Sequence, residues 1–185
     1  MRETDKNIVL AMNHWAEEMA DFSLPAWESI PQLALYMDQV IILLTQYLGP
    51  LARTQGEKGI TASIINNYVR LKIMPPPVKK KYGRVHLAYL IILCMLKQSL
   101  SISAIRRMLP DDHSEEATKM LYEAFRKQFK QITDTFVRDL QCREPLLLPH
   151  LGDSPVTAAA IISNLSKDLT EVMLQAGPKE TVMTE

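Results

Sequence analysis

Prolines are the feature of this 185-residue chain that most restricts how it can fold. Each proline removes a backbone hydrogen-bond donor and disfavours helix at the residue before it, so helices must fit between prolines. The eleven prolines, among them the run 75–77, leave intervals rich in Leu, Ile, Met and Ala. Because the chain has only six glycines and four phenylalanines, these intervals favour helices over a sandwich or a barrel. We therefore expect a mainly α fold.

Apolar residues recur at helical spacing in the first fifty residues and indicate two helices there. The spacing predicts an amphipathic helix at 5–22 and a second helix at about 32–48, which Gly49-Pro50 should stop. The segment 25–31 is bounded by prolines and should be a connector. Residues 49–59 contain three glycines and a proline, and they predict a loop.

Several short elements are predicted between residues 60 and 110. Thr61 is suited to be an N-cap, so a helix at about 62–72 should follow it. The charged stretch 78–85 is too short for a core helix and predicts a tight hairpin. The largely apolar helix expected at about 86–98 falls short of the roughly 20 residues that a membrane helix needs, so it should be buried. Ser101 should cap a short helix that ends before Pro110.

Two helices are expected in the C-terminal part of the chain. Ser114 and the two glutamates after it indicate the start of a long helix, about 27 residues or roughly 40 Å. A last helix should begin at Pro155, with Ser154 as its cap. The apolar stripe of the long helix consists of Leu121, Phe125, Phe129, Ile132, Phe136 and Leu140. We expect three regions: a helix and connector at 1–30, a central domain at 31–110, and C-terminal helices at 111–185.

Charge is unevenly distributed along a chain whose net charge is zero. Residues 1–52 and 108–185 each carry a net charge of −5, whereas residues 53–107 contain eleven basic residues and one acid. A basic block of this strength is typical of a surface that binds a polyanion.

The helix expected at 62–72 separates polar from apolar residues. Asparagine can bind adenine N6 and N7, arginine can bind guanine O6 and N7, and no acid on this helix repels phosphate. Every surface helix needs a polar face, so this pattern alone does not distinguish a recognition helix from an ordinary one. The cations that follow it in the sequence favour DNA or another polyanion. The polar face consists of Ser63, Asn66, Asn67 and Arg70, opposite Ile64, Ile65, Tyr68, Val69 and Leu71, with Lys72 at the helix end.

The order of these elements carries a family resemblance. A capped helix with an aromatic residue near its middle leads through Met74-Pro75-Pro76 to the basic stretch 79–84, an apolar helix, and a short helix introduced by Ser101. From Thr61 to Leu109 the chain thereby resembles the MerR-type winged helix-turn-helix. The resemblance implies a short β-hairpin wing and a recognition helix in the major groove of DNA.

The same resemblance implies roles for individual residues. Thr61, Ser63, Asn66, Asn67, Arg70 and Lys72 would lie at the recognition helix, and Lys79, Lys80, Lys81, Tyr82 and Arg84 would bind the flanking backbone. The long helix from Ser114 resembles the MerR dimerisation helix, which implies a homodimer through 115–141. The stretch from Leu24 to Leu109 also resembles a bacterial family known only as a domain of unknown function, through the segments 35–40 and 66–69. That second resemblance implies no activity.

No pattern of residues points to catalysis. His14, His86, His113 and His150 are scattered, and no metalloprotease, dinucleotide, P-loop or nucleophile-elbow motif occurs. We therefore expect no enzymatic activity, cofactor or metal. Cys94 and Cys142 lie far apart, and the chain starts without a leader-like segment, so we expect a cytoplasmic protein.

Two functions are compatible with these features. The first is a sequence-specific regulator of transcription that binds double-stranded DNA as a dimer. The second is a helical protein-interaction module whose basic middle docks an acidic partner and has no nucleic-acid role. The sequence does not identify an effector.

Overall fold

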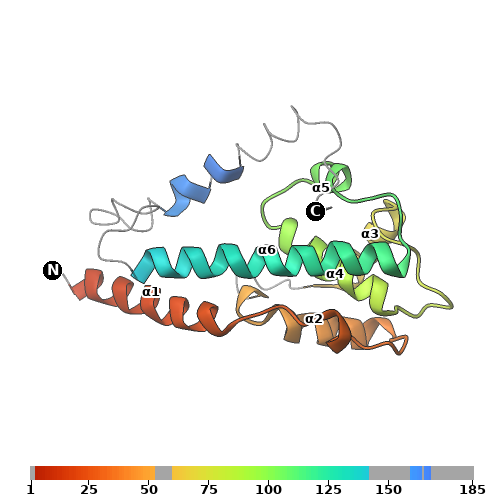
Figure 1. Cartoon of the computed structure of the whole chain (residues 1–185), viewed down its shortest axis with the longest axis horizontal. Helices are drawn as coiled ribbons and strands as arrows, with labels where there is room; N and C mark the ends of the chain where they lie inside the picture. The colour runs from red at the N-terminus through yellow and green to blue at the C-terminus, as the bar shows by residue number, and fades with distance from the viewer. Residues whose placement is uncertain (1–2, 53–59, 142–158, 164, 168–185) are drawn as a thin grey trace. The chain divides into compact units, whose positions relative to one another are not determined.

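The computed structural model describes residues 3–52, 60–141, 159–163 and 165–167. These residues are mainly helical and contain no strand, as Figure 1 shows. They fall into two compact units: a terminal unit that includes residues 3–23, 127–141, 159–163 and 165–167, and a central unit that includes residues 24–52 and 60–126. The elements are α1 (Glu3–Asp21), the 3₁₀ turn η1 (Trp27–Ser29), α2 (Met37–Ala52), α3 (Ala62–Arg70), α4 (Arg84–Leu96), α5 (Ile102–Met108) and α6 (Glu115–Gln141).

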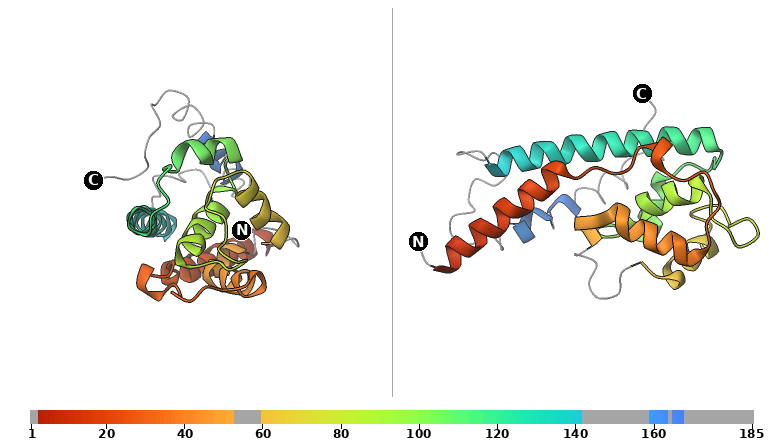
Figure 2. Two further views of the ribbon diagram at one scale, coloured as in Figure 1. Left: turned by 90° about the vertical axis from the view of Figure 1, so that its right-hand side faces the viewer. Right: turned by 90° about the horizontal axis from the view of Figure 1, so that it is seen from below.

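Helix α4 forms the core of the central unit. Nine consecutive residues from His86 to Cys94 are buried, so this stretch has no solvent-exposed face. Helix α2 packs against both α4 and α3, and α4 lies among α2, α3 and α5 (Figure 2). The buried helix predicted at 86–98 is thus confirmed, with its start two residues earlier. In the described part of the chain, no helix is long and apolar enough to cross a membrane.

Helix α2 begins five residues later than the sequence predicts, because the chain before it pairs with a distant segment. Leu35 and Tyr82 exchange two backbone hydrogen bonds of 2.9 Å, which keeps Leu35 extended. The Tyr36 N–H then donates to Oε1 of Gln39 at 2.9 Å at the helix start. At the other end Gly49 has a φ of 37° and interrupts the helix where the sequence predicts its stop.

The prediction of a β-hairpin wing at 78–85 is wrong, since no paired strands form there. Val78 and Lys81 exchange backbone hydrogen bonds of 3.0 and 3.1 Å around a two-residue turn. The Val78–Lys81 pair and the Leu35–Tyr82 pair are isolated bridges. Because α4 already begins at Arg84, the returning arm is too short to become a strand. We call residues 78–81 the lysine turn.

The terminal unit is built on two helices that run antiparallel. The Trp15 ring meets Phe136 edge-on with centroids 6.0 Å apart, and Phe22 meets Phe129 in the same way at the same distance. Phe22 follows Trp15 by seven residues, and its partner Phe129 precedes Phe136 by seven residues. The two segments therefore run in opposite directions. Lys130 Nζ also donates to the carbonyl oxygen of Ala20 at 2.9 Å, near the end of α1.

The two C-terminal helices that the sequence predicts are described to different extents. Helix α6 begins where predicted, and Ser114 Oγ accepts a hydrogen bond from the Ala117 N–H at 3.3 Å. Residues 159–163 and 165–167 are helical, as expected of the last helix. Its predicted start at Ser154-Pro155 lies outside the described residues.

Candidate nucleic-acid interface

Helix α3 carries most of the residues that the sequence predicts for DNA contact. Thr61 is its N-cap, and Thr61 Oγ1 accepts a hydrogen bond from the Ile64 N–H at 3.4 Å. The helix ends at Arg70, and Lys72 has a left-handed backbone with a φ of 54°. Thr61 and Lys72 are both exposed, at opposite ends of the helix. The helix predicted at 62–72 is therefore confirmed, two residues shorter than expected.

The buried side of α3 is narrower than the sequence pattern predicts. Ile65 and Tyr68 are buried, whereas the side chains of Ile64 and Leu71 remain 36% and 37% exposed. Only two side chains of this short helix are therefore fully buried. The polar face is open as predicted: Ser63, Asn66 and Arg70 are exposed and Asn67 is half-buried.

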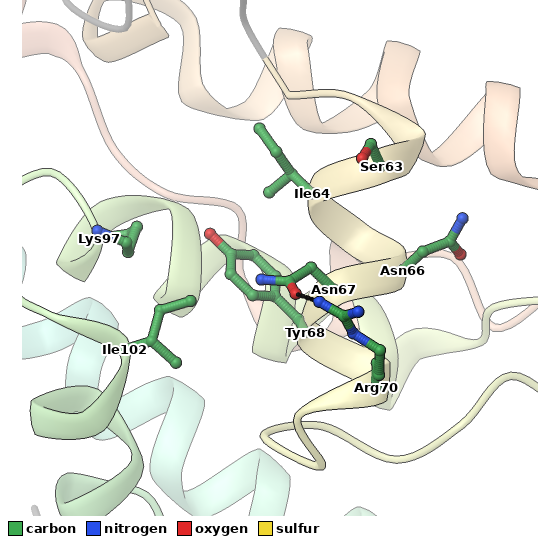
Figure 3. Close-up of a pocket in the computed structure, with 8 residues that line it drawn as sticks. All are labelled: Ser63, Ile64, Asn66, Asn67, Tyr68, Arg70, Lys97 and Ile102. Carbon is green, nitrogen blue, oxygen red and sulfur yellow. Dashed lines mark hydrogen bonds between the residues drawn. The ribbon is translucent and has the colours of Figure 1, made fainter.

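The polar face of α3 forms one wall of an open groove with a volume of about 560 Å³ (Figure 3). The opposite wall comes from Lys97, directly after α4, and from Ile102, the first residue of α5. Sequence reasoning missed both residues as parts of this site. Lys97 belongs to the basic block, but no periodicity in the sequence indicates that it faces α3. The α3 residues that line the groove are Ser63, Ile64, Asn66, Asn67, Tyr68 and Arg70.

Hydrogen-bond donors dominate the polar part of this groove. An Nη of Arg70 donates to Oδ1 of Asn67 at 2.7 Å, which occupies that oxygen and leaves the Asn67 amide nitrogen as a donor. Burial raises the pKa of Tyr68 to about 12, so its hydroxyl keeps its proton at neutral pH. The groove is therefore suited to ligands that present hydrogen-bond acceptors, such as phosphate oxygens or guanine O6 and N7.

The lysine turn presents two cations on a strained backbone. Lys79 and Lys80 are exposed, with φ values of 51° and 62°. A two-residue hairpin turn of this type requires positive φ at both central positions, where asparagine and glycine are usual. The third lysine, Lys81, makes a cation–π contact within the protein, because its Nζ lies 4.9 Å from the centre of the Tyr36 ring.

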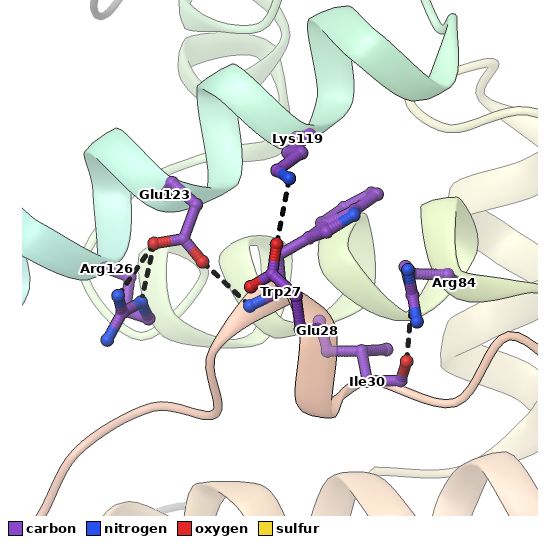
Figure 4. A network of polar contacts seen from close by, with 7 residues as sticks. All are labelled: Trp27, Glu28, Ile30, Arg84, Lys119, Glu123 and Arg126. Atoms are coloured by element: carbon purple, nitrogen blue, oxygen red, sulfur yellow. Dashed lines mark hydrogen bonds and ion pairs between the residues drawn. The ribbon is translucent and has the colours of Figure 1, made fainter.

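Two of the predicted contact residues, buried Tyr82 and half-buried Arg84, make contacts within the central unit. Tyr82 is only 3% exposed, and its ring meets His86 edge-on at 5.6 Å. The Nε of Arg84 donates to the Ile30 carbonyl oxygen at 2.8 Å, and its guanidinium lies 5.5 Å from the centre of the Trp27 ring (Figure 4). Both side chains support the fold here, so we omit them from the candidate interface.

Glu28 of η1 and Glu123 of α6 are both paired within the central unit (Figure 4). Glu28 binds Lys119 at 2.8 Å, and this hydrogen bond lowers the pKa of Glu28. Glu123 accepts from the Trp27 N–H at 2.7 Å and from Arg126 at 2.7 Å. These carboxylates therefore have cationic partners of their own, none of which belongs to the groove or the lysine turn.

A buried histidine connects the two ends of the segment that holds the lysine turn. His86 Nδ1 accepts from the Gly83 N–H at 3.0 Å, and His86 Nε2 lies 3.1 Å from the Pro76 carbonyl oxygen. The neutral ring with its proton on Nε2 satisfies both contacts. Burial lowers the pKa of His86, which favours that neutral form.

The candidate interface is positively charged because the segment that forms it contains no acidic residue. Between residues 60 and 107 there are nine basic residues and no acidic one. No carboxylate of this segment can therefore neutralise the groove or the lysine turn. The exposed cations of this segment include Arg70, Lys72, Lys79, Lys80, Lys97 and Arg106.

Two further features concern metal binding and the thiol of Cys94. The described residues contain no group of three or more His, Cys, Asp or Glu side chains placed to hold a metal ion. Burial raises the pKa of the Cys94 thiol to about 12, which makes it a poor nucleophile.

Comparison with known proteins identifies the module to which this interface belongs. A family model described as "Domain of unknown function (DUF1836)" matches residues 25–125, more than half of the chain. These bounds agree within one residue at each end with the central unit, residues 24–126. No curated protein and no solved structure matches the chain.

Proposed function

Because the chain belongs to the DUF1836 family, whose description names no activity, we propose from its own surface that it is a sequence-specific DNA-binding regulator of transcription. One observation carries the proposal. The polar face of α3 lines an open groove with Lys97, inside a segment that contains nine cations and no acid. Such a surface attracts the phosphates of DNA and offers donors to the base edges.

The side chains of α3 favour double-stranded DNA as the ligand. Ser63, Asn66 and Asn67 are short, so they reach base edges only if the helix itself enters a groove. The major groove of B-form DNA, about 12 Å wide, admits an α-helix. The major groove of A-form RNA is too narrow for this mode of binding.

The order of elements supports a MerR-like arrangement with one modification. A capped recognition helix, a proline-marked turn, a buried helix and a short capped helix follow each other as in that class. The lysine turn would take the place of the wing and contact the flanking phosphates. In a homodimer through 115–141, two recognition helices would read the halves of a palindromic site. A cytoplasmic location completes the proposal, since a reducing compartment suits the buried free thiol of Cys94.

Charge reversal in the lysine turn tests the proposal. In Lys79→Glu/Lys80→Glu, duplex affinity should fall at least about tenfold, and the slope of log K against log salt should become shallower by about two. Fluorescence anisotropy with a labelled random-sequence duplex, at about 50 to 200 mM salt, measures both quantities. The control is Lys167→Glu, which reverses a charge at an exposed position outside both α6 and the basic segment and should bind as the wild type.

Two results would count against the proposal. Equal binding by the turn variant and the wild type would remove the lysine turn from the interface. A wild-type protein that binds no duplex even at low salt would favour the other hypothesis, a helical module for an acidic protein partner.

Removal of one amide group tests whether α3 reads sequence. Asn67→Ala should relax the base preference found by selecting duplexes from a random pool, while affinity for nonspecific DNA changes little. Lys80→Ala provides the contrast, because loss of a phosphate contact should weaken binding to all sequences alike. If Asn67→Ala retains the wild-type base preference, this residue makes no base contact.

A further inference from the structure

Two isoleucines give the groove an apolar surface that the helical pattern of α3 does not explain. Ile64 belongs to the apolar side of α3 by its spacing, but its side chain is 36% exposed. It lines the groove together with Ile102, the first residue of α5, on the opposite wall (Figure 3). Apolar side chains in a groove otherwise rich in donors indicate a ligand that is itself partly apolar and partly anionic.

Each wall of the groove also carries one cation. Arg70 extends from α3, and Lys97 follows α4 on the opposite side (Figure 3). Lys97 Nζ donates to the Leu100 carbonyl oxygen at 3.3 Å, which holds the ammonium group near the turn. An ammonium group has three donors, so the others remain for a ligand. No acidic side chain is among the residues that line the groove in the described part of the chain.

The alternation of charge and apolar surface matches a DNA strand. Along such a strand, anionic phosphates alternate with deoxyribose rings, which lack the 2′-hydroxyl that would need a partner against an isoleucine. A free inorganic anion would use the cations but would leave Ile64 and Ile102 without a role. Base edges, in turn, would not require a cation on each wall.

We propose that the groove between α3 and the α4–α5 turn seats the sugar-phosphate backbone of one DNA strand. Lys97 binds a phosphate, and Ile64 and Ile102 pack against deoxyribose. The inference rests on the proposed function and divides the work within the groove: the cations and isoleucines hold phosphate and sugar, and the amide groups of Asn66 and Asn67 remain for base edges. No residue of the lysine turn lines the groove. It also gives Lys97 and Ile102 a role that neither the sequence pattern nor the family description assigns.

Substitution of Lys97 tests the phosphate contact. Lys97→Met keeps most of the side-chain stem and removes the charge, so duplex affinity should fall about fivefold to tenfold near 0.1 M salt. The slope of log K against log salt should become shallower by about one. Lys167→Met, at an exposed lysine outside both α6 and the basic segment, is the matched control and should keep the wild-type affinity and slope.

Substitution of the isoleucines tests the sugar contact by a different signature. Ile64→Ser and Ile102→Ser should each lower duplex affinity about threefold to tenfold with no change in the salt slope, because an apolar contact releases no counterions. Thermal unfolding of each variant checks that the fold persists. Ile64→Ser is the safer variant, since Ile64 is already partly exposed.

The outcomes separate this inference from the proposed function. Wild-type affinity and slope in Lys97→Met would overturn the phosphate seat, even if the lysine-turn variant loses binding as expected. Unchanged affinity in a folded Ile64→Ser or Ile102→Ser variant would overturn the sugar contact. If the wild type binds no duplex at low salt, both the proposed function and this inference fail.

Discussion

His86 shows how one buried side chain can fix the position of an exposed one. Its two ring nitrogens contact Gly83 and Pro76, on either side of the lysine turn. A second proton on the ring would place an N–H against the Gly83 N–H and abolish that hydrogen bond. The neutral ring is therefore part of the structure that holds the turn.

Acid should destabilise the fold through His86. In the unfolded chain this group titrates near its ordinary value of 6.5, whereas burial lowers its pKa in the folded protein. The unfolded state therefore takes up the proton first. The stabilisation is complete above the unfolded pKa and is lost as pH falls through the lowered folded pKa.

Urea unfolding at about pH 7.5 and about pH 5.5 measures this effect. The wild-type free energy of unfolding should be smaller at the acidic pH, and His86→Gln should show less of this loss. His14→Gln, at an exposed histidine, serves as the control and should follow the wild type. An equal pH dependence in His86→Gln would show that the buried ring is not the source.

Individual contact residues were harder to predict than the face that carries them. The polar residues of α3 are open because helical periodicity alone decides which side they occupy. Tyr82 and Arg84 look like members of the same basic stretch, yet their partners Leu35, Ile30 and Trp27 lie far away in the sequence. Only the tertiary fold brings those partners close, so the sequence offers no signal for them.

The lysine turn places two charged residues at backbone positions that lower the stability of the fold. Lys79 and Lys80 occupy left-handed conformations that cost a residue with a side chain roughly 1–2 kcal/mol each. Asparagine and glycine fit this geometry better. The residues that strain the turn are also those proposed to bind phosphate.

Relief of this strain should separate stability from binding. Lys79→Asn/Lys80→Gly should raise the free energy of unfolding by about 1 kcal/mol and lower duplex affinity, since two cations are lost. Chemical denaturation and fluorescence anisotropy measure the two effects. Lys79→Gln/Lys80→Gln should lose the same affinity without the gain in stability. A stability gain in both variants, or in neither, would contradict the strain argument.

Most helix boundaries were predictable because their signals are local. Thr61 and Ser101 cap α3 and α5 as their positions predict, and the Ser101 hydroxyl accepts from the Ala104 N–H at 3.1 Å. The start of α2 and the form of the wing were not predictable, because both depend on the bridge between Leu35 and Tyr82. Lys97 and Ile102 were missed for the same reason, since the fold brings their turn opposite α3.

At the scale of the whole molecule, α6 is the element proposed to join two copies. Much of its predicted stripe is covered within the chain, since Leu121 is buried and Phe129 and Phe136 pair with Phe22 and Trp15. Ile132 is the exception, with 61% of its side chain exposed. The homodimer through 115–141 therefore stays a prediction that depends on a limited apolar area.

Light scattering tests the dimer directly. A dimer should show twice the chain mass of 21.0 kDa, and Ile132→Glu should shift the mass toward the monomer because a charge would be buried at the interface. Lys127→Glu, at an exposed position of the same helix, should leave the mass unchanged. A monomer mass at a protein concentration of about 100 µM would contradict the dimer, since stable dimers bind more tightly than that.

The partition of charge has a consequence for how such a molecule meets its target. The central unit carries thirteen basic and eight acidic residues, and the rest of the chain holds eight basic and thirteen acidic ones. Because the whole chain has no net charge and salt screens each charge beyond about 10 Å at 0.1 M, a polyanion would be attracted by the basic residues only at short range. Capture would then begin only near contact, so encounter would be slow while the bound complex could still be long-lived.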